Sequence, residues 1–320
     1  MATYRAEGPY FDDLHVGLSF DSAPAYTLTD GRQAAHQAIV GDRLRLPLDD
    51  VLATKVAGGS LAHPAYVWDV AIGQSTLATQ HVRANLFYRN LIFRRWPLIG
   101  DTLRTTTTVV GLKENRRKEG RPPTGLAALQ MVTTDQQGRT VLDFYRCAML
   151  PLRGDSTGHN DALDLIGAGG SPDPLACLDG LDLAALPQTR GLPAEGDEIR
   201  VVGGDVVSSA PELARLSLNI AAVHHDSAAA AGTRLVYGGH TIGIALSQAS
   251  RAIAGLVGVL GWHSCDHIGP VHEGDTLRSV VTIERLQPGR DGSFLADLRS
   301  RVESDQGGAV LDWRFSALLR

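Results

Sequence analysis

The residues best suited to chemistry are an asparagine and a histidine on one loop, followed by a pair of glycines. Asn219 and His224 are separated by four residues, and Gly238 and Gly239 follow where a run of small apolar residues predicts the start of a helix. An imidazole that titrates near neutrality can activate water and return a proton. The first N–H groups of a helix lack partners and can stabilise a developing oxyanion, and glycine allows close approach to them.

These groups suit the addition of water to a double bond conjugated with a thioester. That reaction needs a base for the water, an acid for the α-carbon and fixed donors for the enolate oxygen. We expect His224 to carry the proton transfers alone, because Asn219 has no basic group. Asn219 is expected to hold and orient the water, while a purely structural role as a helix C-cap remains an equal alternative.

The elements that must position these residues occur twice. The sequence Gly-Asp-Thr-Leu-Arg at 100–104 recurs at 274–278, and an Asp-Gln turn with the strand that follows it, at 135–144, recurs at 305–313. The offsets are 174 and 169 residues, and the two matches keep the same order. This repeat indicates that one fold is used twice.

The repeat divides the chain into an N-terminal domain at 1–153, a linker at 154–195 and a C-terminal domain at 196–320. In each copy a helix of small apolar residues, at 64–80 and at 238–257, precedes a meander of alternating strands. The clear strands are predicted at 102–112, 127–135, 140–150, 276–286, 293–303 and 309–319. A helix followed by an antiparallel meander indicates an α+β fold.

Composition and charge exclude several classes of function. The chain has 320 residues, 43% of them hydrophobic, and 30 basic against 35 acidic residues give a net charge of −5. Binding a polyanion needs a concentrated positive field, so we expect no nucleic-acid partner. No apolar run is long enough to cross a membrane, which predicts a cytoplasmic protein without a membrane partner. The sequence contains no Rossmann G-x-G-x-x-G after a predicted strand, no P-loop, no G-x-S-x-G motif of α/β-hydrolases and no H-E-x-x-H motif of zinc proteases.

The cysteines and histidines do not form a recognisable metal motif. The three cysteines are widely spaced, with neither a zinc pattern nor a CxxC pair. His263, Cys265 and His267 would share one face of a regular strand. We favour a role for this strand in lining a substrate tunnel or a domain contact, and we predict no metal.

The stretch from Asn219 to Gly239 resembles the MaoC-like, or (R)-specific enoyl-CoA hydratase, family of hotdog folds. That family has an Asp-x4-His pattern, an Ala-His-Gly sequence that opens its central helix, and a later Pro-Val-x-x-Gly-Asp-Thr-Leu. Residues 219–224, the helix start at Gly239 and residues 270–277 match these motifs in order. The resemblance covers nearly the whole chain in two copies. It implies a double hotdog, in which each antiparallel sheet wraps around a central helix.

The resemblance implies a role for each matching residue. His224 stands at the catalytic histidine, Gly239 at the glycine whose N–H faces the thioester oxygen, and Asn219 where the family has the aspartate of its dyad. The Asn-x4-His version is similar to that of mesaconyl-CoA hydratases, which act on a branched, carboxylated enoyl-CoA. The further residues expected to contact the substrate are Gly238, His240, His63, Arg89 and Arg94.

The first copy lacks the reactive groups at the matching positions. Asp42 aligns with Asn219, but Pro47 falls where His224 stands in the second copy. Pro64 takes the place of the N–H donor, which proline cannot supply. We therefore predict that the first domain is catalytically degenerate and serves in structure and substrate binding.

The implied reaction is the reversible hydration of a 2-enoyl-CoA to a 3-hydroxyacyl-CoA, by a homo-oligomer. Coenzyme A is then part of the substrate, and no cofactor is expected. Two alternatives stay open: a non-catalytic acyl-CoA-binding or assembly protein, favoured by Asn219 and the degenerate first copy, and an acyl-carrier-protein dehydratase. A hotdog thioesterase ranks lower, because the sequence signals no carboxylate placed to activate water.

Overall fold

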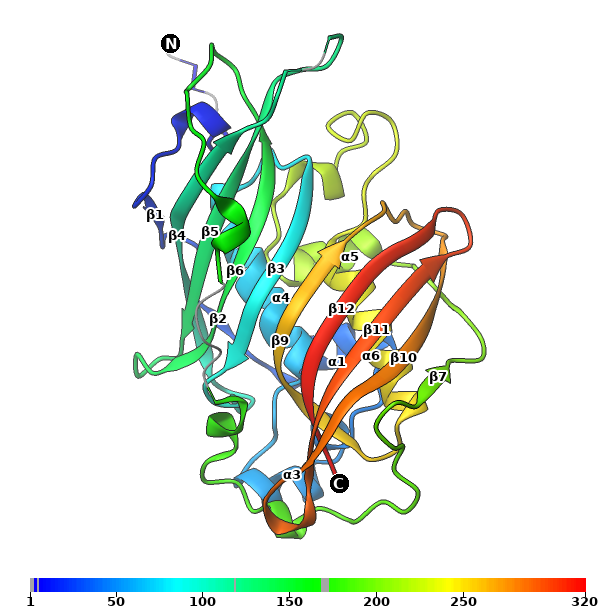
Figure 1. The fold of residues 1–320 in the computed structure, drawn as a ribbon. Helices are drawn as coiled ribbons and strands as arrows, with labels where there is room; N and C mark the ends of the chain where they lie inside the picture. The colour runs from blue at the N-terminus through cyan, green and yellow to red at the C-terminus, as the bar shows by residue number, and fades with distance from the viewer. Residues whose placement is uncertain (1–2, 5, 118, 168–172) are drawn as a thin grey trace.

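Each sequence copy folds into the predicted α+β unit, a curved antiparallel sheet with a long helix along its inner face (Figure 1). The computed structural model describes residues 3–4, 6–117, 119–167 and 173–320. The first copy contains β1 (Ser19–Phe20), β2 (Tyr26–Thr27), α1 (Asp30–Val40), α2 (Arg45–Leu48), α3 (Asp50–Ala57), α4 (Pro64–Gln74), β3 (Ala84–Phe93), β4 (Thr102–Glu114), β5 (Thr124–Thr134) and β6 (Thr140–Pro151). The second contains β7 (Glu198–Arg200), β8 (Asp205–Val206), α5 (Ala210–Leu216), α6 (Gly238–Ala252), β9 (Leu256–His267), β10 (Thr276–Pro288), β11 (Phe294–Ser304) and β12 (Gly308–Leu319).

The two copies join edge to edge through β3 and β9. Within the described residues the strand order is β1-β4-β5-β6-β3-β9-β12-β11-β10-β7, with β2 paired to β4 and β8 to β10. The antiparallel register sets Tyr88 opposite Cys265 and Arg89 opposite Ser264. The two copies therefore share one continuous sheet, and both helices lie on the same side of it (Figure 1).

The central helices α4 and α6 are buried because most of their residues are apolar or small, and each of the two also buries polar side chains. All residues of α4 are buried, and so are those at 239–249 of α6. Gln74 and Gln248, 174 residues apart, each donate from Nε2 to a strand carbonyl, at Leu103 (3.1 Å) and Leu277 (2.9 Å). The sequence repeat is thus a structural repeat as well.

Both helices end earlier than their predicted limits of 80 and 257. After α4 the chain tightens into a 3₁₀ turn at Ser75–Ala78, where the Ser75 hydroxyl donates to the Ile72 carbonyl (2.6 Å). After α6 the residue Ile253 is already extended, and Leu256 pairs with Leu319 in the sheet. The small apolar residues after 252 therefore belong to a buried strand, which periodicity alone does not distinguish from a buried helix.

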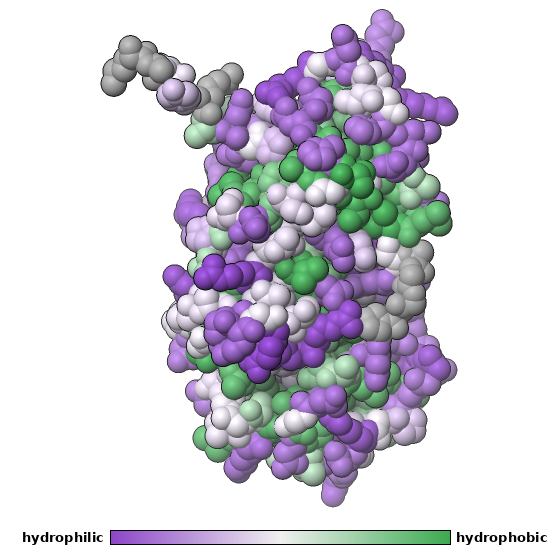
Figure 2. All heavy atoms as spheres, turned by 90° about the vertical axis from the view of Figure 1, so that its left-hand side faces the viewer, coloured by the Kyte–Doolittle hydropathy of each residue, from purple (hydrophilic) through white to green (hydrophobic). Residues whose placement is uncertain are grey.

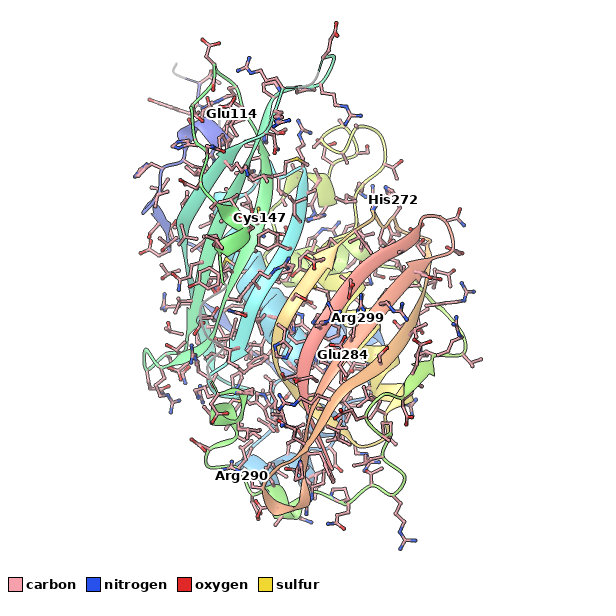
Figure 3. All side chains as sticks on the ribbon, viewed as in Figure 1. Glu114, Cys147, His272, Glu284, Arg290 and Arg299 are labelled. Carbon is pink, nitrogen blue, oxygen red and sulfur yellow. The ribbon has the colours of Figure 1, made fainter. Side chains whose placement is uncertain are left out.

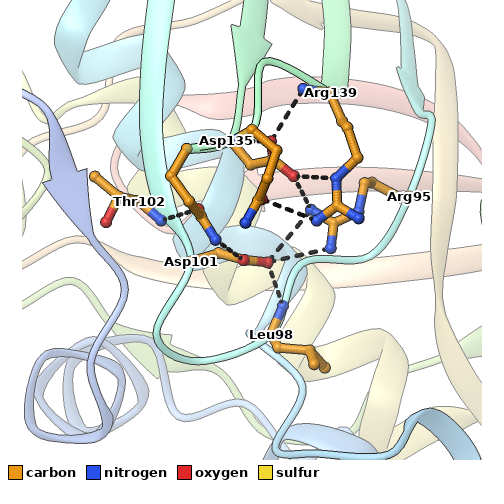
Figure 4. A network of polar contacts seen from close by, with 8 residues as sticks. Arg95, Leu98, Asp101, Thr102, Asp135 and Arg139 are labelled. Carbon is orange, nitrogen blue, oxygen red and sulfur yellow. Dashed lines mark hydrogen bonds and ion pairs between the residues drawn. The ribbon is translucent and has the colours of Figure 1, made fainter.

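The recurring Gly-Asp-Thr-Leu motif shapes a turn at the start of a long strand in each copy. The Asp101 carboxylate accepts from the backbone N–H of Leu98 (2.9 Å), from Gln136 (2.8 Å) and from Arg95 (3.3 Å) (Figure 4). Arg95 also pairs with the buried Asp135 (2.7 Å). These contacts hold the hairpin ends together, so the motif is structural rather than part of a site.

The predicted linker packs against both domains where it is described, at 154–167 and 173–195. Leu163 lies over the outer face of the first sheet beside Cys147, which Figure 3 places under this segment. Cys177 and Leu183 join the main core. The remaining part of the linker, at 168–172, lies outside the described residues.

The outer surface is polar and ion-paired. Figure 3 shows Arg299 and Glu284 on the outer face of the second sheet, where Arg299 pairs with Asp312 and Glu284 with Arg314. On the face shown in Figure 2, hydrophilic side chains surround the apolar patches. Among the described residues no helix is long and apolar enough to span a membrane.

Candidate active site

A cavity of about 350 Å³ opens between the two copies. The first copy supplies Thr76, the segment 82–86, Tyr88 and Arg146, and the second supplies the loop of Asn219 and His224 with the start of α6. The loop and helix start that the sequence singled out are therefore brought together, and a wall from the other copy completes the cavity.

His224 sits on a short 3₁₀ turn, Ala222–His224, with its imidazole against the cavity. Its Nδ1 lies 2.7 Å from the carbonyl oxygen of Leu235. Because a carbonyl can only accept, Nδ1 carries the proton and Nε2 is left as the basic nitrogen. The ring packs edge-on against Tyr237, with 5.8 Å between centroids. Burial lowers the pKa of His224 to about 4, so the imidazole is neutral at physiological pH.

Asn219 lines the same cavity and also braces its own loop. It follows Leu218, whose φ of 62° lies in the left-handed region, and this turn reverses the chain after α5. Its Oδ1 accepts from the Ala221 N–H (3.0 Å), and its carbonyl accepts from Nε2 of His225 (2.7 Å). Within the described residues Nδ2 makes no hydrogen bond. The amide thus combines a structural oxygen with a nitrogen free to donate to a ligand.

At the start of α6 the two glycines have different neighbours. Gly238 lines the cavity, and a Cβ there would lie 2.6 Å from the imidazole of His267. A Cβ on Gly239 would instead lie 2.2 Å from Oδ1 of Asp69 and 2.4 Å from the ring of Tyr237. Neither backbone N–H finds an acceptor among the described residues. Gly238 therefore lines the cavity wall with an open N–H, whereas Gly239, the residue that the sequence analysis singled out, does not line the cavity.

Sequence reasoning missed a buried polar network beside the cavity. The Tyr237 hydroxyl donates to Oδ1 of Asp69 (2.9 Å), and Oδ2 of Asp69 lies 2.9 Å from Nε2 of His36. Burial, with the nearby Asp69 charge, raises the pKa of Tyr237 well above its usual value, so the phenol stays a donor. Asp69 and His36 belong to the first copy, so the first copy orients a residue of the second.

Arg146 is the second residue that the sequence analysis missed. It lies in the middle of β6, points to the inner face and is 3% exposed. Its guanidinium donates to the Ser75 carbonyl (3.4 Å) and to the Thr79 hydroxyl. Arg146 alternates with the apolar residues at 142, 144, 148 and 150, and this was a signal available in the sequence, since arginine is almost never fully buried unless it is paired.

The structure places the other predicted substrate contacts outside this cavity. His63 caps α4 by accepting from Ala65 (3.1 Å), and its Nε2 lies 2.6 Å from Asp42. His240 is fully buried one turn into α6. The two predicted arginines form ion pairs with residues of neighbouring strands, Arg89 with Asp266 (2.7 Å) and Arg94 with Asp143 (2.8 Å).

The expectation that His263, Cys265 and His267 share a face of one strand is wrong, because β9 contains a bulge. The register passes from Trp262 opposite Phe315 to Ser264 opposite Arg314, so His263 is an extra residue. His263 is exposed, Cys265 is fully buried and His267 lines the cavity. The described residues hold no group of three side chains able to bind a metal ion.

The equivalent place in the first copy is filled. A pocket of about 20 Å³ lies where the repeat would put a second cavity. Pro47 and Pro64 line it, and the ring of Trp96 occupies the space beside Gly258, whose Cβ would lie 2.9 Å from that ring. The indole also donates to the Val259 carbonyl (3.2 Å), which fixes it in place.

We expect one ligand site per chain. Calorimetric titration with a slowly reacting enoyl-CoA analogue should saturate at one equivalent, because the second position is too small for an acyl group. Trp96→Ala would enlarge that pocket without restoring a histidine or an N–H donor, and it serves as the control. Saturation of the wild-type protein at two equivalents would contradict the assignment.

The fold and the cavity together define a double hotdog protein, as the sequence predicted. No protein-family model matches the chain. It is 52% identical to a conserved hypothetical protein of Mycobacterium tuberculosis with a double hotdog fold, and the match covers 98% of this chain and 99% of that one with a TM-score of 0.92.

Two further proteins extend the comparison. The mesaconyl-CoA hydratase of Cereibacter sphaeroides is 29% identical over 85% of this chain and 82% of its own. A putative MaoC domain dehydratase from Chloroflexus aurantiacus is 23% identical, and its structure matches 99% of both chains with a TM-score of 0.87. The chain belongs to the same double hotdog family as the M. tuberculosis protein, and over most of its length it is similar to a named mesaconyl-CoA hydratase.

Proposed function

We propose that the protein is an acyl-CoA hydratase that adds water reversibly to a 2-enoyl-CoA and yields a 3-hydroxyacyl-CoA. The observation that carries the proposal is His224, neutral and with Nε2 free as a base, in the same cavity as Gly238, whose open N–H begins α6. His224 takes a proton from the water whose oxygen bonds to the β-carbon, and it returns that proton to the α-carbon. Asn219 holds the water, and the helix start stabilises the enolate oxygen formed in between. In the reverse direction the same groups remove water.

The substrate in this proposal is a coenzyme A thioester, and the relative in C. sphaeroides supports mesaconyl-CoA as the first candidate. The enzyme would work in the cytoplasm as a homo-oligomer and would need no cofactor or metal. The water addition requires neither redox chemistry nor a Lewis acid, since an imidazole and fixed N–H donors supply both the proton transfers and the stabilisation of the oxyanion.

Two alternatives are tested by the same experiment. The protein is incubated with crotonyl-CoA, longer straight-chain enoyl-CoAs and mesaconyl-CoA, and the absorbance of the conjugated thioester is followed. We expect loss of that absorbance and formation of the 3-hydroxyacyl-CoA with at least one of them. Turnover of the same acyl groups only on an acyl-carrier protein would favour a carrier-protein dehydratase, and binding without turnover would favour the non-catalytic alternative.

A further inference from the structure

We propose that Arg146 determines the specificity of the cavity, by binding a carboxylate on the acyl chain beside the double bond that is hydrated. This inference rests on the proposed hydratase function and names the class of its substrate, a 2-enoyl-CoA with a second acidic group. Arg146 comes from the domain that lacks catalytic groups, so that domain would select the substrate which the other domain converts.

The first support is that the Arg146 guanidinium does not make all the hydrogen bonds it could make. Arg146 lines the cavity, and its Nε has no hydrogen-bond partner although the atom is buried. Its contacts at Ser75, Thr79 and the Tyr88 hydroxyl are all neutral. Among the described residues no carboxylate forms an ion pair with it. A buried cation without an anionic partner is costly, and a carboxylate is the group whose two oxygens fit an arginine side by side.

The neighbouring acidic group is already used. Asp69 is fully buried, with one carboxylate oxygen held by the Tyr237 hydroxyl (2.9 Å) and the other beside His36 (2.9 Å). Those bonds link α4 to α1 and to Tyr237, the residue before α6. An anion that completes the contacts of Arg146 must therefore come with the ligand.

The second copy supplies an internal comparison. In the first copy Tyr88 of β3 lies opposite Arg146 of β6. The repeat places Trp262 where Tyr88 stands, and its partner across the strands is Phe315. The same position of the same fold is therefore filled by two aromatic rings. Because the fold accommodates an apolar pair at this position, the fold itself does not require Tyr88 and Arg146. The Tyr88–Arg146 pair is therefore associated with the open cavity.

A substrate carboxylate suits this position better than the other anionic groups of an acyl-CoA. The thioester oxygen acquires charge only as the enolate forms, and the free N–H groups at the start of α6 suit that transient charge. The phosphates of coenzyme A lie at the far end of the pantetheine arm, away from the carbons that react beside His224. A second carboxylate on the acyl chain carries its charge from binding to release, as a permanent buried cation requires.

The test compares two substrates and two proteins. For the wild type we expect kcat/KM for mesaconyl-CoA to exceed that for crotonyl-CoA. Arg146→Gln should lower kcat/KM for mesaconyl-CoA by about 10²-fold or more, mainly through KM, and change the value for crotonyl-CoA by less than about threefold. Arg146→Lys should recover part of the loss, since it restores the charge without the two-pronged geometry. Arg299→Gln, on the outer sheet face, is the matched control.

A second measurement needs no variant and so does not depend on folding. The wild type is given mesaconyl-CoA whose free carboxylate is replaced by the neutral amide, and kcat/KM should fall by about 10²-fold. Equal turnover of acid and amide, or equal losses for both substrates in Arg146→Gln, would overturn the inference while leaving the hydratase function intact. If the wild type hydrates no enoyl-CoA at all, the proposed function fails instead.

Discussion

His224→Ala is expected to lower kcat for hydration by about 10²- to 10⁴-fold, the range that a positioned general base contributes. The imidazole is fixed by the hydrogen bond from Nδ1 to the Leu235 carbonyl and by the Tyr237 ring, so its Nε2 meets the cavity in one orientation. Asn219 has no basic atom to take over the proton transfer. The rate is measured with saturating enoyl-CoA, and the melting temperature confirms that the variant is folded.

A control and a pH profile separate this role from a structural one. Asn219→Ala should lower kcat less than His224→Ala does, because it removes the group that orients the water and leaves the base in place. Asn219→Asp restores the Asp–His dyad that is usual in the family it resembles. Since the pKa of His224 is about 4, the imidazole is protonated only below that pH. Wild-type kcat/KM should therefore stay level from neutrality into mild acid and fall only near pH 4. A folded His224→Ala enzyme that kept half its rate would exclude this residue as the base.

The repeat, the strand meander and the pairing of the Asn219 loop with the start of α6 could be predicted from the sequence, because each depends on a local pattern of residues. The repeat also located the equivalent positions of the first copy, since Pro47 and Pro64 could be aligned without any structure. What fills the space beside them could not be predicted. Trp96 reaches Gly258 across the join between the copies, and no local pattern reports a contact between residues so far apart.

Sequence reasoning misplaced several site residues because their positions depend on helix packing and strand register. His63 and His240 stand next to the matched motif, but one caps its own helix and the other faces the interior between α4 and α6, so neither reaches the cavity. Arg146 of β6 lies opposite Tyr88 of β3, and Arg89 is one residue further along β3, opposite Tyr145. That single step in register sends Arg89 outward to Asp266 and leaves Arg146 facing inward.

The largest expected loss of stability comes from Gly73→Ala, in the last turn of α4. A Cβ at this position would lie 1.6 Å from the carbonyl oxygen of Ser217 and 3.1 Å from the backbone N of Asn219. Backbone atoms cannot yield as a flexible side chain does, so α4 and the Asn219 loop must separate. We expect a loss of about 3 kcal/mol or more in the free energy of unfolding, at the upper end of overpacking effects.

The same substitution should also reduce activity, since the Asn219 loop is held to α4 by the bond from the Ile220 N–H to the Thr76 hydroxyl (3.0 Å). The second copy shows what a side chain needs there: Ser247, at the repeat-equivalent position, has room and donates to the Gly41 carbonyl (2.7 Å). Gly31→Ala, on the exposed side of α1, is the control and should leave stability unchanged or raise it by about 0.5 kcal/mol. Urea unfolding monitored by circular dichroism measures both variants. A Gly73→Ala protein as stable as the wild type would mean that the loop can leave α4 without cost, and the cavity would then not be set by this contact.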